Sequence, residues 1–258
     1  MKLTDMQKLY SLEGLTAAVT GGATGLGLAI TKCLAAAGAR VAVISRDLSG
    51  NASEILAELD GKVSFYPFDI TETQKSQEIA DIIRADLGPC SILVNNAGNH
   101  CKKYIWDMSA EEYRKVLDVH LTGAFALTKA FLPQMRENSF GRILFLASMT
   151  SYIGQPQVCG YATAKAGILG LVHTLAAETA SFGVTVNAIA PGWIDTPMFR
   201  QATSQDPARL QKILGRIPAG QIGSPMDVGH CAAFLCSRAA GYINGACIPV
   251  DGGALIGF

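Results

Sequence analysis

The feature that most constrains this chain is the alternation of short runs rich in β-branched residues with longer amphipathic segments. The short runs predict strands at seven places: 16–20, 40–45, 63–68, 92–95, 142–147, 185–189 and 247–250. Helical patterns lie between them, near 25–38, 50–60, 72–87, 109–137, 158–182 and 225–239. Such alternation indicates βαβ crossovers, and therefore an α/β fold with one doubly wound parallel sheet and helices on both faces.

Composition excludes several other classes of protein. The chain has 258 residues, of which 49% are hydrophobic and 16% charged, so it can build a full core and is not disordered. Lys and Arg number 21, and so do Asp and Glu. With no net positive charge, neither nucleic acid nor an acidic membrane surface is the expected partner.

The cysteines indicate a reducing compartment. They are odd in number and scattered, without a C-x-x-C pair, at positions 33, 90, 101, 159, 231, 236 and 247. A disulfide framework and a metal site are therefore not expected. The N-terminus lacks the apolar run of a signal peptide, and no stretch approaches a membrane helix of about 18 residues, so the expected location is cytoplasmic.

A glycine-rich run follows the first predicted strand. It reads Gly21-Gly22-Ala23-Thr24-Gly25-Leu26-Gly27 and is followed by an amphipathic helix. Glycines let the backbone approach a pyrophosphate, which the helix N-terminus then binds through free N–H groups. An ordinary turn is the alternative, but the position between strand and helix favours a dinucleotide site. The spacing is T-G-x-x-x-G-x-G and not the common G-x-G-x-x-G.

The end of the second strand indicates which dinucleotide is bound. If the strand ends at Ser45, the acidic residue that would select NAD is absent, and Arg46 is free to pair with the 2′-phosphate of NADP. If the strand continues for two residues, Asp47 could be that acid. The sequence favours NADP(H) over NAD(H).

Four further motifs complete a known pattern: Asn95-Asn96-Ala97-Gly98, Ser148 with Y-x-x-x-K at 161–165, P-G-x-x-x-T at 191–196 and V-D-G-G at 250–253. With these motifs and the glycine-rich run in this order, the chain resembles the classical short-chain dehydrogenase/reductase family. The resemblance is closest to the 3-oxoacyl carrier-protein reductases and the gluconate-5-dehydrogenase-like sugar-acid enzymes of that family. The resemblance implies one NAD(P)-binding Rossmann-type domain over 1–258, with a substrate lid at about 195–218. It also implies an oxidoreductase that acts on CH–OH groups.

The chemistry of the catalytic set can be argued from the residues. Tyr161 and Lys165 lie four positions apart, on one face of a helix. A nearby ammonium favours the phenolate and should lower the pKa of Tyr161 toward the working pH. Tyr161 would then protonate a carbonyl oxygen while Ser148 donates a hydrogen bond to it. The resemblance adds that Lys165 holds the nicotinamide ribose.

The resemblance carries further cofactor contacts to this chain. Asp69 corresponds to an adenine-contacting acid, although it could also cap the helix that begins near Thr71. The remaining positions would line the cofactor along the carboxyl ends of the strands: Ile70, Asn96, Ala97, Gly98, Pro191, Gly192, Ile194 and Thr196.

One position departs from the family. The family places Asn in the run D-V-N-L-x-G, where it holds a water that links the lysine to solvent, and this chain has His120 there. His120 is either a packing residue bound to a carbonyl or a relay member, because imidazole can donate and accept. Both interpretations remain open.

The substrate is expected to be small and polar. His100, Lys102, Lys103 and Arg200 could bind a carboxylated polyol, although the lysines could simply point to water. The start of the lid is also polar, so a sugar acid is favoured, with an acyl-carrier thioester as the alternative. A non-enzymatic scaffold would have lost Ser148, Tyr161 or Lys165, and an epimerase would need a longer chain.

The segment 158–182 is apolar or small nearly all round. A helix of this kind needs cover on both sides. We therefore expect a homo-oligomer, a tetramer by resemblance or else a dimer.

Overall fold

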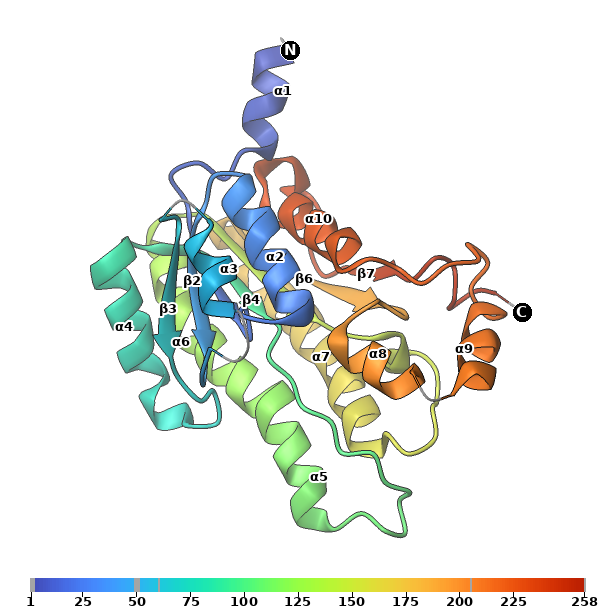
Figure 1. Cartoon of the computed structure of the whole chain (residues 1–258). Coiled ribbons are helices and arrows are strands. Elements are labelled where there is room, and N and C mark those ends of the chain that lie inside the picture. The colour runs from blue at the N-terminus through green and yellow to red at the C-terminus, as the bar shows by residue number, and fades with distance from the viewer. Residues whose placement is uncertain (1–2, 49–51, 60, 205, 258) are drawn as a thin grey trace.

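The computed structural model describes residues 3–48, 52–59, 61–204 and 206–257 (Figure 1). Its seven strands form one parallel sheet in the order β3-β2-β1-β4-β5-β6-β7. The strands are β1 (Thr16–Thr20), β2 (Arg40–Ser45), β3 (Val63–Pro67), β4 (Cys90–Asn95), β5 (Gly141–Leu146), β6 (Val184–Pro191) and β7 (Cys247–Val250). The order reverses between β1 and β4, which confirms the predicted doubly wound α/β fold.

Helices cover both faces of this sheet. They are α1 (Leu3–Tyr10), α2 (Gly25–Ala36), α3 (Ala52–Ala57), α4 (Ser76–Leu87), α5 (Ala110–Leu117), α6 (Ala124–Glu137), α7 (Cys159–Thr179), α8 (Pro197–Thr203), α9 (Pro207–Leu214) and α10 (Pro225–Cys236). Helices α2 and α10 pack on one face, whereas α4, α6 and α7 pack on the other. In Figure 1, α1 projects away from the body, and α8 and α9 lie on the side of the C-terminus.

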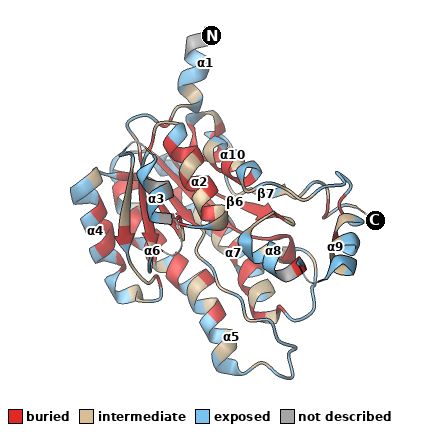
Figure 2. Ribbon diagram, viewed as in Figure 1, coloured by how far each residue is buried: buried red, intermediate tan, exposed pale blue. Residues whose placement is uncertain are grey.

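The five inner strands are buried because their side chains pack into a core on each face of the sheet, whereas the edge strands β3 and β7 are only partly buried. In β1, Ala18 packs into the core under α4, α6 and α7, whereas Ala17 and Val19 pack into the core under α2 and α10. This follows from the period of two in a strand, which points successive side chains to opposite faces. Figure 2 shows the result, with buried strands between helices that are buried on one side only.

Several elements differ from the sequence-based prediction. The strand ends shift by up to two residues, and the segment predicted as one helix over 109–137 is α5, a π-helical turn at 118–123, and α6. Helices α1, α8 and α9 were not expected. In the predicted helix 50–60, residues 50, 51 and 60 lie outside the described residues, as do residue 205 of the lid and the extreme ends of the 1–258 domain.

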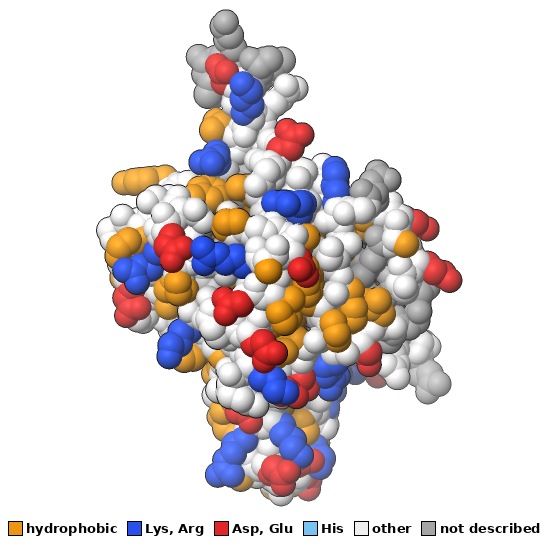
Figure 3. All heavy atoms as spheres, turned by 90° about the vertical axis from the view of Figure 1, so that its left-hand side faces the viewer, with side chains coloured by type: hydrophobic (Ala, Val, Ile, Leu, Met, Phe, Trp, Pro, Cys, Tyr) orange, Lys and Arg blue, Asp and Glu red, His pale blue; other side chains and the backbone are white. Residues whose placement is uncertain are grey.

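Parallel strands bring their carboxyl ends to one edge of the sheet. The residues singled out from the sequence follow β1, β2, β3, β4, β5 and β6 at this edge, which is where doubly wound sheets bind ligands. On the face seen in Figure 3, acidic and basic side chains intermingle. Within the described ranges, no helix is long and apolar enough to span a bilayer.

Candidate active site

The turn between β1 and α2 requires glycine at three positions. Gly21 and Gly25 have φ angles of +62° and +53°, which is a left-handed conformation that residues with side chains rarely adopt. At Gly27 a Cβ atom would collide with the carbonyl oxygen of Gly21. The turn is therefore a close-fitting backbone cradle, and any side chain at Gly27 would force α2 away from it.

The N-terminus of α2 is open toward this cradle. Thr24 is the N-cap residue, but its side chain makes no capping hydrogen bond. The N–H groups of the first helical turn are therefore available to an anion. Ala23 and Leu26 pack into the core beneath, which anchors the turn from below.

The turn after β4 is tied to the same cradle. The side-chain amide of Asn96 donates to the carbonyl oxygens of Thr20 and Gly21 at 2.9 and 3.2 Å. In return, the Thr20 hydroxyl accepts hydrogen bonds from the backbone N–H groups of Asn96 and Ala97 at 2.9 and 3.0 Å. Four hydrogen bonds thus join the two turns across the point where the strand order reverses.

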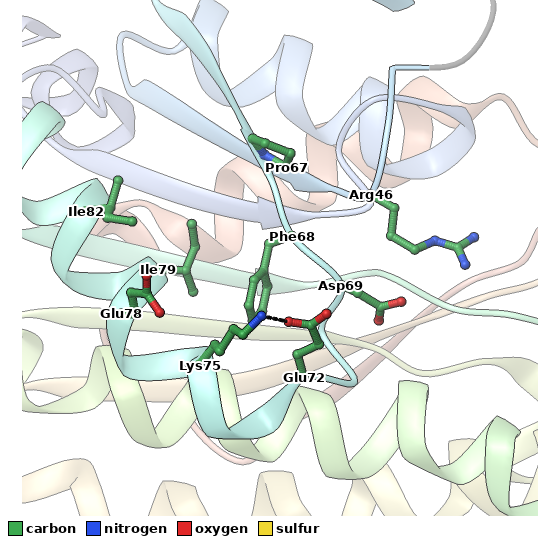
Figure 4. Close-up of a pocket in the computed structure, with 9 residues that line it drawn as sticks. All are labelled: Arg46, Pro67, Phe68, Asp69, Glu72, Lys75, Glu78, Ile79 and Ile82. Carbon is green, nitrogen blue, oxygen red and sulfur yellow. Dashed lines mark ion pairs between the residues drawn. The ribbon is translucent and has the colours of Figure 1, made fainter.

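The end of β2 decides between the two interpretations of the next residues. The strand ends at Ser45, so Arg46 is the first residue beyond it and Asp47 lies outside the strand. A pocket of about 370 Å³ begins here and extends between β3 and α4. It is lined by Arg46, Pro67, Phe68, Asp69, Glu72, Lys75, Glu78, Ile79 and Ile82 (Figure 4).

Asp69 lies near Arg46 at one end of this pocket (Figure 4). Its carboxylate accepts hydrogen bonds from the Thr71 N–H and hydroxyl at 2.9 and 2.7 Å, so it does stabilise the following turn. Burial opposes ionisation, but these two hydrogen bonds and the Arg46 charge keep the pKa of Asp69 below its ordinary value. Ile70 is buried beside it, and its carbonyl lies against Gly123.

Ser148, Tyr161 and Lys165 come together beyond the end of β5. Ser148 caps a short turn by accepting the Thr150 N–H at 3.1 Å, and its hydroxyl lies close enough to the Tyr161 phenol to influence the pKa of that phenol. The Lys165 ammonium lies 5.5 Å from the centre of the Tyr161 ring and donates to the carbonyl oxygen of Leu146. The spacing of these residues in the sequence therefore does place them at one point.

Burial controls the proton affinities in this set. It raises the pKa of Tyr161, and the Ser148 hydroxyl offsets only part of that rise. It lowers the pKa of Lys165 to about 7. The expected lowering of the Tyr161 pKa by the ammonium is thus wrong for this structure, because the lysine is itself desolvated and turned toward Leu146.

His120 lies in the π-helical turn between α5 and α6, and such turns often occur at functional sites. Its Nε2 is 2.9 Å from the Asn99 carbonyl oxygen and 3.2 Å from the Asn99 N–H, and the shorter contact favours Nε2–H as the donor. Its Nδ1 is then an acceptor, fully buried and without a partner among the described residues.

The His120 ring stands edge-on to Tyr161, with 5.3 Å between ring centres. Gly98 lies directly against it, because a Cβ atom there would collide with the imidazole. Burial, and then the charge of Lys165, lower the pKa of His120 to about 3. The imidazole is therefore neutral at any ordinary working pH.

His100 also packs against the tyrosine, with its ring centre 4.2 Å from that of Tyr161. Burial, followed by the charges of Lys102 and Lys165, lowers the pKa of His100. Lys102 is exposed and forms no ion pair within the described part of the chain. His100 and Lys102 are thus the two members of the expected substrate group that remain available.

The other two expected cations are already neutralised. Lys103 forms an ion pair with Glu112. Arg200 forms a bidentate pair with Asp195, at 2.7 and 2.8 Å. Each of these cations therefore has a carboxylate partner within its own chain, and a substrate anion would have to compete with that carboxylate.

The loop after β6 is held by the C-terminal segment. Pro191 ends the strand, and the Gly192 N–H donates to the Val250 carbonyl oxygen at 3.0 Å. A Cβ atom at Gly192 would lie 2.7 Å from the Cβ of Asp251. The backbone at Gly192 is therefore close-packed, and glycine is required by space.

Two further loop residues begin the lid. Ile194 is buried and pairs with Gly223 in an isolated parallel bridge. Thr196 caps α8 by accepting the Phe199 N–H at 3.2 Å. Its side chain therefore has a structural partner already.

Asn99 was missed by sequence reasoning. Its backbone orients His120, and its own Oδ1 is buried without a partner among the described residues. Its place directly after the Asn95–Gly98 motif could have indicated that Asn99 belongs to the site.

As for metals, no group of three or more His, Cys, Asp or Glu in the described ranges could hold an ion.

A family model and two known proteins that are similar to this chain are named as reductases. The family model described as enoyl-(acyl carrier protein) reductase matches residues 21–254. The chain is 39% identical to acetoacetyl-CoA reductase of Rhizobium meliloti (92% of this chain, 97% of the relative) and 36% identical to 3-oxoacyl-acyl-carrier-protein reductase FabG of Escherichia coli (94% and 98%).

A solved structure shares the fold as well as the sequence pattern. It is a gluconate 5-dehydrogenase from Burkholderia cenocepacia in complex with NADP and tartrate. The two structures superpose with a TM-score of 0.90 at 28% sequence identity, and the alignment covers 96% of this chain and 98% of the Burkholderia chain.

Proposed function

The chain belongs to the short-chain dehydrogenase/reductase family, and from this premise we propose that it interconverts a carbonyl and a secondary alcohol at Tyr161. The observation that carries the proposal is the meeting of Ser148, Tyr161 and Lys165 at the carboxyl edge of the sheet, the edge that also carries the glycine cradle. In this proposal one domain spans 1–258, and 195–218 form the lid over the substrate.

Tyr161 is the acid/base. Its raised pKa keeps the phenol protonated, which is the state that can give a proton to a carbonyl oxygen during reduction. Ser148, whose hydroxyl lies close to that phenol, donates to the same oxygen as negative charge develops on it. Lys165 borders the tyrosine, and its ammonium would bind hydroxyl groups of a cofactor on turning away from the Leu146 carbonyl.

A nicotinamide dinucleotide supplies the hydride when bound, and the residues present fit such a group. The glycine cradle leaves room for a pyrophosphate, and the open first turn of α2 supplies N–H donors and a positive dipole end. We assign the cofactor contacts to Gly21, Ala23, Thr24, Gly25, Leu26, Gly27, Ser45, Arg46, Asp69, Ile70, Asn96, Ala97, Gly98, Tyr161, Lys165, Pro191, Gly192, Ile194 and Thr196.

The cofactor proposed is NADP(H) rather than NAD(H). Because β2 ends at Ser45, no acidic residue stands at its tip, and Arg46 borders the pocket that contains Asp69. A guanidinium there would bind a 2′-phosphate through charge-assisted hydrogen bonds. The related gluconate 5-dehydrogenase was solved with NADP, which supports this choice.

His120 is proposed as part of the proton path rather than as packing alone. The Asn99 carbonyl accepts its Nε2–H, so its buried Nδ1 keeps a free lone pair in a ring that stands edge-on to Tyr161 and is influenced by the Lys165 charge. A water or the ammonium itself could donate to that nitrogen. A neutral imidazole would in this way replace the amide that the family usually has.

The proposed substrate is a small sugar acid or its keto form. His100 packs on Tyr161, and Lys102 lies near it with no carboxylate partner in the described chain, so the pair can bind an anionic group at the entrance. The gluconate 5-dehydrogenase relative supports this class. The alternative is an acyl thioester, which the acetoacetyl-CoA reductase and FabG relatives support.

A paired substitution tests the substrate class. We expect kcat/KM for a keto-aldonate to exceed that for an acetoacetyl thioester, and Lys102→Ala to lower the keto-aldonate value by about tenfold. Lys103→Ala is the matched control, because that ammonium is already paired with Glu112, and it should change the value by less than about threefold. A preference for the thioester, or equal effects of the two changes, would reject the sugar-acid assignment.

Two wider proposals concern the setting of the enzyme. We propose a homotetramer, because α7 exposes a face of small residues that another helix could approach closely.

We also propose the cytoplasm as the location of the enzyme, since all seven cysteines are unpaired thiols.

A further inference from the structure

A third hydrophobic core lies apart from the two that flank the sheet. Ile213, Ile217 and Ala254 are its buried centre, with between 2% and 7% of their surfaces exposed. Partly buried side chains surround them: Trp193, Phe199 and Ile222. We call these six residues the lid core, because the lid helices α8 and α9 contribute to it.

The lid is pinned at its base. Ile194 pairs with Gly223, and the bridge is closed by two hydrogen bonds, from the Gly223 N–H to Trp193 (3.0 Å) and from the Asp195 N–H to Gly223 (2.8 Å). The chain therefore leaves the body and returns to it at one point. Two adjacent residues pack into different cores: Ile194 packs into the core under α2 and α10, and Trp193 packs in the lid core.

The C-terminal tail completes the lid core. The Asp251 carboxylate accepts the N–H groups of Gly253 and Leu255, both at 2.9 Å, which folds the tail into a turn. The Ala219 N–H donates to the Gly252 carbonyl oxygen at 3.0 Å. Cβ atoms at Gly253 and Gly257 would lie 3.2 and 2.8 Å from the Pro218 ring, so the tail packs closely against the segment that follows α9.

We propose that Trp193 is a positioning residue, which holds α8, α9 and the C-terminal tail as one packed unit and thereby sets the affinity for substrate. Its backbone follows Gly192 at the edge where Ser148 and Tyr161 lie, whereas its ring belongs to the lid core. The part that concerns substrate rests on the proposed function. Because the Trp193 ring packs in the lid core, we expect its loss to change KM and to leave kcat and cofactor affinity nearly intact.

Hydrogen exchange of the whole protein tests the packed unit without any substrate. In Trp193→Ala, amides of α8, α9 and the tail should lose protection together, whereas β1 and α2 should keep theirs. Trp193→Phe should restore the protection. Trp106→Ala is the matched control, since Trp106 is 76% exposed and lies outside the lid core. Loss confined to the residues next to Trp193, or spread over the sheet, would overturn the proposal.

Steady-state kinetics tests the positioning role. With the carbonyl substrate that the parent reduces, Trp193→Ala should raise KM by about tenfold, with kcat and the NADPH dissociation constant within about threefold. Trp193→Phe should bring KM back to within about threefold. An unchanged KM, or a parallel loss of kcat and cofactor affinity, would reject the role.

A less disruptive variant keeps the proposal testable if Trp193→Ala does not fold. Ala254→Gly removes one buried methyl group on the tail side and should reduce protection of α8 and α9 while raising KM by about twofold to fivefold. No change in either quantity would also overturn the proposal. If the parent reduces neither a keto-aldonate nor an acetoacetyl thioester, the proposed function fails, whereas the exchange experiment still decides on the lid core.

Discussion

At the scale of single residues, Lys165 lies where burial opposes the charge on its side chain. Its side chain is 4% exposed, its ammonium faces the Leu146 carbonyl, and no ion pair to it occurs among the described residues. His120 is subject to the same desolvation and stays neutral. A buried group kept in an unfavourable state indicates a role other than stability.

This cost predicts a pH-dependent gain in stability for Lys165→Met. The folded protein holds the lysine at a pKa of about 7, below its ordinary 10.5, so the folded state binds fewer protons than the unfolded state between these values. The penalty is therefore complete below pH 7 and is relieved as the pH rises toward 10.5. The free energy of unfolding should increase by roughly 2–5 kcal/mol at pH 6 and by much less at pH 10.

Denaturant titrations at the two pH values would measure this gain. Lys129→Met on the exposed surface of α6 is the control and should change stability little at either pH. A variant at Lys165 that is less stable than the parent at pH 6, or equally shifted at both pH values, would contradict the burial argument.

Arg46 predicts the choice of cofactor. Arg46→Ala should weaken NADPH binding by about tenfold or more and NADH binding by less than about threefold, since only NADPH carries the phosphate that the guanidinium would bind. Asp47→Ala should affect neither, because Asp47, unlike Arg46, does not line the pocket that contains Asp69. Fluorescence titration of both cofactors measures this. If Asp47→Ala selectively weakened NADH binding, Asp47 would instead be the acidic residue that selects NAD.

At the scale of elements, α7 contributes to two different surfaces. Ala164, Ile168 and Val172 are buried against the sheet, whereas Ala166 and Gly170 are exposed on the opposite side. An exposed face of such small residues allows close approach of another helix, which is why we propose that it is an oligomer interface.

Gly170→Glu tests this face of α7. A Cβ atom at Gly170 meets no atom within 4 Å, so the substitution should leave the fold of one chain intact while placing a charge in the proposed contact. Light scattering at micromolar protein should find four chains per particle for the parent and fewer for the variant. Ala85→Glu on the exposed side of α4 is the control. A parent of one chain, or a tetrameric Gly170→Glu, would refute the interface.

Elements with strong periodicity could be predicted from the sequence, and short ones could not. The five inner strands are buried and all seven read as apolar or β-branched runs, so the positions of the strands were predicted to within two residues. Helices α8 and α9 are short, but Thr196-Pro197 and Asp206-Pro207 are N-cap and N1 signals that could have revealed them. The π-helical turn at 118–123 leaves the helical hydrophobic pattern almost unchanged and gave no signal.

At the scale of the whole molecule, the sequence predicted which residues meet but not their electrostatic state. Motif spacing and parallel topology place Ser148, Tyr161 and Lys165 at one edge, as the structure does. Burial depends on every packed neighbour, so the raised pKa of Tyr161 could not be derived from spacing. The partners of Lys103 and Arg200 likewise come from the folded arrangement of α5 and the lid.

The most direct test of the account is the turnover of Tyr161→Phe. This change removes the transferable proton and keeps the ring, so kcat should fall by about 10²–10⁴-fold, while the dissociation constant for NADPH stays within about threefold of the parent value. Tyr104→Phe, at an exposed tyrosine, controls for loss of a phenol elsewhere and should be fully active. A Tyr161→Phe enzyme that reduces its carbonyl substrate as fast as the parent would contradict the assignment of Tyr161 as the acid/base.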